Sequence, residues 1–118
     1  MKGLDTYKEV AITTQGRGRL VVMLYDGAIK FLKLALNDFD TGNAEARWNN
    51  IKRALDIIDE LNAVLNMEAG GEVAVNLRKL YLFMIGHLNM ANAKKDPQMI
   101  QDVINLLDEL NQGWKAIA

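Results

Sequence analysis

Few side chains of this sequence could perform chemistry, and the first to consider is its single histidine, His87. The residue three positions before it is Met84. A di-metal centre in a helical bundle needs a Glu-x-x-His pair from each of two helices, so one histidine cannot complete that ligand set. We expect His87 to make an ordinary hydrogen bond on a helix face. The alternatives are pH sensing and service as a lone metal ligand.

Acidic and nucleophilic residues also argue against catalysis. Asp56, Asp59 and Glu60 are clustered at helical spacing, as an acid–base pair would require, but Lys52 and Arg53 lie about one turn before them. This pattern is typical of a solvated, ion-paired helix face. The sequence contains neither serine nor cysteine, the two commonest nucleophiles, and disulfides are excluded with cysteine. We therefore predict a protein that is not an enzyme, with no metal or cofactor.

Size and charge exclude further classes of function. The 118 residues are enough for one domain with a hydrophobic core. A formal net charge of -1 provides no basic field for nucleic acid or an anionic membrane. The first ten residues lack the apolar region of a signal peptide, and no stretch approaches the roughly 18 apolar residues of a membrane span. We expect a cytosolic protein that neither binds nucleic acid nor inserts into membranes.

Hydrophobic spacing of three and four residues predicts four helices, most strongly at 23–35. Turn and cap residues separate them: Gly42 and Asn43, then two adjacent glycines, then Asp96 followed by proline. The helices are expected at about 18–39, 44–67, 72–92 and 97–115.

Short connections require these helices to run up-down-up-down. The predicted fold class is therefore all-α, an antiparallel four-helix bundle. We expect the bundle to occupy residues 17–118. Residues 1–16 form an N-terminal segment that is either flexible or docked as a flap.

The helices carry more apolar residues than one buried stripe each requires. On the first helix we expect a buried stripe of Leu20, Met23, Leu24, Ala28, Phe31, Leu32 and Ala35, and an apolar flank of Val21, Val22, Tyr25 and Ile29. Exposed apolar surface usually marks a partner site, and grooves between helices suit amphipathic helical segments. The alternative is a generous core with partly buried flanks.

Seven flanking residues are the expected partner-binding surface of the bundle: Tyr25, Ile29, Ile57, Val64, Leu82, Ile85 and Ile104. Periodicity alone does not decide which of two apolar flanks faces outward. We expect Asp26 and Gly27 to serve the structure, Gly27 by permitting close approach of a neighbouring helix.

Long ordered blocks of this sequence resemble the flagellar secretion chaperone FliS, a family that serves flagellin. These blocks are MLYDGAIKFLKLA at 23–35, GGEVAVNLRKLYLFM at 70–84, and INLLDEL at 104–110 followed by Trp114. The resemblance extends from about Tyr7 to Trp114 and implies an antiparallel four-helix bundle. One departure is the stretch from Thr14 to Gly18, where many relatives carry Thr-Ala-Ser-Pro-Glu.

The resemblance implies a cytosolic chaperone without ATPase activity. Such a protein binds the disordered C-terminal segment of flagellin, prevents premature polymerisation and aids delivery to the flagellar type III export gate. It also implies an N-terminal segment packed near the ligand groove, so Leu4 and Tyr7 join the expected partner-binding residues as a gate that flagellin displaces. Alternatives are a regulator that binds an anti-sigma factor or another flagellar assembly factor, and a homodimer of the free protein through the same apolar surface.

Overall fold

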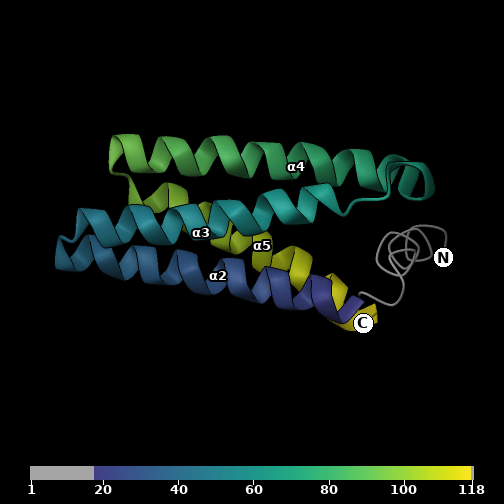
Figure 1. Ribbon diagram of the computed structural model, residues 1–118, viewed down its shortest axis with the longest axis horizontal. Helices are drawn as coiled ribbons and strands as arrows, with labels where there is room; N and C mark the ends of the chain where they lie inside the picture. Colours follow the sequence, from purple (N-terminus) through teal and green to yellow (C-terminus); the bar gives the residue numbers. More distant parts are fainter. Residues whose placement is uncertain (1–17, 118) are drawn as a thin grey trace.

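The computed structural model describes residues 18–117, and within this range every element is a helix. The elements are α2 (Gly18–Thr41), α3 (Ala44–Ala63), α4 (Met67–Lys94) and α5 (Pro97–Ile117). Figure 1 shows them side by side along the long axis, joined by short connections at alternate ends. Each helix packs on the next in chain order, and α5 closes the ring against α2. The predicted all-α, antiparallel four-helix bundle is confirmed.

Two of the three turns form as the sequence predicts. Gly42 adopts a left-handed φ of 72°, and the Asn43 side chain accepts a hydrogen bond of 3.0 Å from the backbone N–H three residues on. Between α4 and α5, Lys95 has a φ of 55°, and the Asp96 carboxylate accepts a 3.0 Å bond from a backbone N–H of the next helix. Pro97 occupies the first position of α5, where its missing N–H leaves no donor unpaired.

The connection between α3 and α4 differs from the prediction. α3 ends at Ala63, and a new helix already begins at Met67. Asn66 caps that helix, because its side chain accepts a 2.9 Å bond from the N–H of Ala69. Gly71, with φ 52° and ψ -129°, then kinks α4. Gly71 therefore bends a helix that already begins after the cap at Asn66. The adjacent glycines do not by themselves make the reversal of the chain between α3 and α4.

The hydrophobic core is one continuous cluster to which all four helices contribute. On α2 the main seam recurs at positions 21, 25, 28, 32 and 35, which is the alternating four- and three-residue spacing of bundle helices. Its buried apolar residues are Val21, Tyr25, Ala28, Ile29, Leu32 and Ala35 from α2; Ile51, Ala54, Ile58 and Leu61 from α3; Ala74, Leu77, Tyr81, Met84, Leu88 and Ala91 from α4; and Ile100, Val103, Ile104, Leu107 and Trp114 from α5.

The buried face of α2 is rotated relative to the predicted stripe. Met23 and Leu20, expected in the core, are 67% and 40% exposed, whereas Tyr25 is fully buried. Ile29 and Ile104 also belong to the core. The expectation that Tyr25, Ile29 and Ile104 lie on an exposed surface is therefore wrong.

A hydrogen bond across the bundle explains why Tyr25 lies inside. Its hydroxyl is 2.6 Å from the hydroxyl of Tyr81 on α4, and the two rings meet edge to face at 6.4 Å. The indole of Trp114 on α5 lies 6.2 Å from the Tyr25 ring. A buried tyrosine needs a partner for its hydroxyl, and the centre of the bundle provides one.

Replacing Tyr81 by phenylalanine should lower the free energy of unfolding by about 1–3 kcal/mol, because the buried hydroxyl of Tyr25 loses this partner while the apolar ring remains. Urea unfolding followed by circular dichroism measures the change. The double variant Tyr25→Phe/Tyr81→Phe should lose less than the sum of the two single variants. Additive losses would contradict a direct interaction between the two hydroxyls.

Candidate partner-binding surface

Exposed large hydrophobic side chains are gathered on two helices, α2 and α4. Neither α3 nor α5 contributes one within the described range. The α2 face, as we call it, consists of Leu20, Met23 and Leu34, and the α4 face of Val75, Leu82, Phe83 and Met90. Their exposed fractions run from 40% to 67%.

The α4 face lies on the side of its helix away from the core. Leu82 and Phe83 follow Val75 by seven and eight positions, and Met90 follows by fifteen, which places all four on one side. The Phe83 ring stacks on the ring of His87 at 4.9 Å. His87 in turn places its Nε2 3.3 Å from the Asp102 carboxylate of α5. The predicted ordinary hydrogen bond of His87 is confirmed, and this contact supports an aromatic ring of the exposed face.

The structure separates the nine residues predicted for partner binding. Leu82 lies on the α4 face. Ile57 and Ile85 are half-buried and pack against the core, and Val64 is half-buried. Tyr25 and Ile104 are core residues, and Ile29 is also buried, although it borders a hollow beside α2. Leu4 and Tyr7 lie outside the described residues.

Ile57 is half-buried because it packs against α2. A Cβ built on Gly27 would lie 3.3 Å from the terminal methyl carbon of Ile57. Gly27 thus permits the close approach of α2 and α3, as predicted. The side chain of Ile57 therefore packs largely against α2.

Sequence reasoning placed Met23 and Leu20 in the core and did not select Leu34 for partner binding. The sequence carries a signal for the observed seam, but positions 24, 28, 31 and 35 show the same spacing, so the signal does not decide between the two. Positions 21, 25, 28, 32 and 35 form an unbroken seam of alternating four- and three-residue steps, which turns Met23, Leu20 and Leu34 away from the core.

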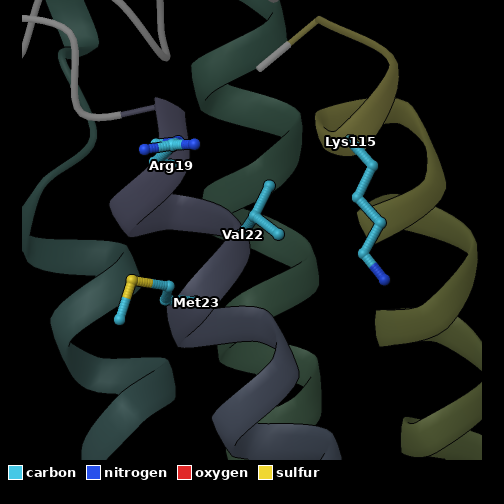
Figure 2. Close-up of a pocket in the computed structure, with 4 residues that line it drawn as sticks. All are labelled: Arg19, Val22, Met23 and Lys115. Atoms are coloured by element: carbon cyan, nitrogen blue, oxygen red, sulfur yellow. The ribbon is translucent and has the colours of Figure 1, made fainter.

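A groove runs along the flank of α2 beside α5. Figure 2 shows the residues that line its first part: Val22 of α2 points toward α5, which carries Lys115, whereas Met23 points away from α5. A second hollow continues along α2. We call the two together the α2–α5 groove; its described lining residues are Arg19, Val22, Met23, Asp26, Ile29, Lys30, Lys33, Leu34 and Lys115.

Asp26 and Asn111 join α2 to α5 at this groove. The buried Asn111 amide donates a 2.8 Å hydrogen bond to the Asp26 carboxylate. The ammonium group of Lys115 lies 3.4 Å from the same oxygen. The structural role predicted for Asp26 is confirmed, since it satisfies an amide at the helix boundary.

Residues 18–117 include no group of three or more histidine, cysteine, aspartate or glutamate side chains that could hold a metal ion. None of the four described helices is long and apolar enough to cross a membrane. What the described surface does offer is apolar: two helix faces and a groove, features suited to contact with another polypeptide.

Sequence comparison identifies the class of protein to which this helical bundle belongs. The model of the family "Flagellar protein FliS" matches residues 1–118. The flagellar secretion chaperone FliS of Vibrio cholerae is 38% identical over 99% of this chain and 90% of its own length. That of Salmonella typhimurium is 36% identical over 98% and 90%, and that of Bacillus subtilis 31% identical over 92% and 80%.

The chain belongs to the FliS family of flagellar secretion chaperones. Its relatives are named for a chaperone role, which is not enzymatic. The prediction of a binding protein without catalytic activity is therefore confirmed.

The hydrogen bonds that Asp102 accepts predict a dependence of stability on pH. A hydrogen bond donated by Gln98, together with the nearby His87, holds the pKa of the Asp102 carboxyl below its ordinary value of 3.8. A pKa that is lower in the folded protein contributes stability above the unfolded value, and this contribution is lost as the pH falls through the folded pKa.

Asp102→Asn should therefore lose stability less steeply than the parent from about pH 5 downward, because it lacks this carboxylate. Thermal unfolding at several pH values, at low and high salt, measures the difference. The effect should be small and weaken with salt, since the pair is exposed. Parallel pH profiles for the two proteins would contradict it.

Proposed function

We propose that this protein binds the C-terminal segment of flagellin in the cytosol and covers it before export. The observation that carries the proposal is the concentration of exposed large hydrophobic side chains on the α2 and α4 faces. In a member of a flagellar secretion chaperone family, a flagellar export client is the natural partner for such surfaces. By covering the client segment, the chaperone would prevent premature polymerisation of flagellin and keep flagellin ready for the type III export gate.

The geometry favours a client that wraps around the bundle. α2 packs against α3 and α5, while α4 lies at the opposite corner of the ring. The two apolar faces therefore point in different directions, so one straight helix cannot cover both. A segment disordered before binding can place one helix on each face and pass between them in an extended conformation.

Burial of the exposed side chains can offset the cost of ordering a client segment. Fully burying a large apolar side chain contributes about 1.5–3 kcal/mol, so a half-exposed one contributes about half of that. The seven exposed residues of the two faces together exceed the roughly 2–5 kcal/mol that ordering a client segment costs. We expect the bound segment to gain helix as it covers them.

Calorimetric titration with a peptide of about the last 40 residues of the cognate flagellin, combined with circular dichroism, tests the proposal. We expect one-to-one binding, a negative heat-capacity change and a gain in helix. Failure of the peptide to bind a well-folded monomer would contradict the proposed function.

The double variant Leu82→Glu/Met90→Glu should weaken flagellin binding about tenfold or more, because it places charges on the α4 face where apolar contacts form. Its melting temperature should stay close to that of the parent, since both side chains are about half exposed. The control Asn49→Glu/Asn105→Glu adds the same charge at exposed positions of α3 and α5. Equal losses in the two variants would argue against the α4 face.

Leu4 and Tyr7 are proposed to form a gate that flagellin displaces when it binds, as the family resemblance implies. Deleting residues 1–12 should leave the helical content intact and change flagellin affinity, because the client would no longer have to displace the segment. The same titration measures this change. An unchanged affinity would remove the gate from the proposal.

A further inference from the structure

The α2–α5 groove is long enough to suit a helix. Its two hollows follow one another on the same flank of α2, from Arg19 to Leu34. This stretch corresponds to about 22 Å of helix, at the usual rise per residue. Apolar side chains lie along it, among them Val22, Met23 and Ile29. An apolar strip of this length matches four turns of an amphipathic helix.

Cationic side chains border this apolar strip. The described lining residues include four cations and one carboxylate, Asp26. That carboxylate already lies 3.4 Å from Lys115, so the two charges offset each other. For Arg19, Lys30 and Lys33, the described part of the chain supplies no ion-pair partner within 4.0 Å. Three positive charges therefore remain uncompensated along the groove.

We propose that the α2–α5 groove selects a helical client segment that is apolar on one face and carries acidic side chains along its edges. The inference rests on the proposed function and specifies the chemistry of one segment of the client. The apolar face would cover Val22, Met23 and Leu34. Its acidic side chains would lie against Arg19, Lys30 and Lys33. A helix with lysines in their place would be repelled by these three cations.

The shape and charge of the molecule favour a peptide helix over a flat anionic surface. The groove is bordered on one side by α5, whose exposed residues include Asp108 and Glu109. A membrane lying across this side would bring those carboxylates against anionic headgroups. The whole chain carries a net charge of -1, which gives no general attraction to polyanions. A narrow helix can contact the cations and stay clear of α5's acidic face.

The charges are expected to set selectivity and the rate of association more than the final affinity. Exposed ion pairs contribute little individually and are screened by salt. Complementary charges nevertheless accelerate encounter and disfavour like-charged partners. The preference for an acidic edge should therefore be large at low ionic strength and shrink as salt is added.

Two designed amphipathic peptides of about 18 residues test the proposal by fluorescence anisotropy. Both carry the same apolar face, and the edges are glutamate in one and lysine in the other. At about 50 mM NaCl the parent protein should bind the glutamate-edged peptide at least about tenfold more tightly, and at about 500 mM the difference should largely disappear. Equal affinities at low salt, or no binding of either peptide, would overturn the proposal.

Lys30→Glu/Lys33→Glu should reverse the preference between the two peptides. Both residues are exposed, so circular dichroism and thermal melting should match the parent. The control Lys52→Glu/Lys94→Glu makes the same change in net charge at exposed positions of α3 and α4, and it should keep the parent's preference. If the control changes the preference as much as Lys30→Glu/Lys33→Glu does, the proposal is wrong.

The flagellin peptide, titrated in parallel, separates this inference from the proposed function. If it binds the parent and the Lys30→Glu/Lys33→Glu protein equally well, the acidic-edge inference fails and the proposed function stands. If the glutamate-edged peptide binds the groove and the flagellin peptide does not bind at all, the proposed client is wrong and the preference of the groove is retained.

Discussion

The hydrogen bond between the Tyr25 and Tyr81 hydroxyls fixes the arrangement on which the rest of this structure depends. It crosses the centre of the bundle between α2 and α4, which occupy opposite corners of the helix ring. A rotation of α2 that turned Tyr25 outward would take this partner from the buried hydroxyl of Tyr81, so the contact favours the rotation that points Tyr25 inward. The same rotation turns Met23 and Leu34 outward. One buried polar contact thus decides which apolar side chains of α2 remain available to a partner.

Polar contacts at the helix boundaries complete this arrangement. Asp26 accepts a hydrogen bond from Asn111, joining α2 to α5, and Arg47 donates a 3.2 Å bond to Asn92, joining α3 to α4. Polar pairs of this kind specify register, because a shifted helix would leave a buried donor or acceptor without its partner. The apolar side chains that the core does not need can then face outward, because polar contacts between the helices fix how the helices pack. A surface for a client is compatible with a unique fold only under that condition.

Much of the fold followed from the sequence, and the failures have a common cause. Local signals gave the four helices, the cap at Asn43 and the start of α5 at Pro97, because caps and proline act within a few residues of their own position. At the turn between α3 and α4 two local signals competed. Asn66 started a helix before Gly71 could end one, and sequence spacing alone gave no ranking of the two. The exposed apolar surface was predicted less well, because exposure depends on contacts with other helices.

The sequence by itself determined that the chain forms four amphipathic helices with more apolar residues than a bundle core consumes, and long blocks within it indicated the FliS family. Composition and periodicity decide these properties. Only the tertiary structure decided that Tyr25, Ile29 and Ile104 are buried and that Met23 and Phe83 are exposed. An apolar arc wider than one seam fits the core in more than one rotation. The rotation is chosen by partners distant in sequence, here a tyrosine hydroxyl 56 positions away.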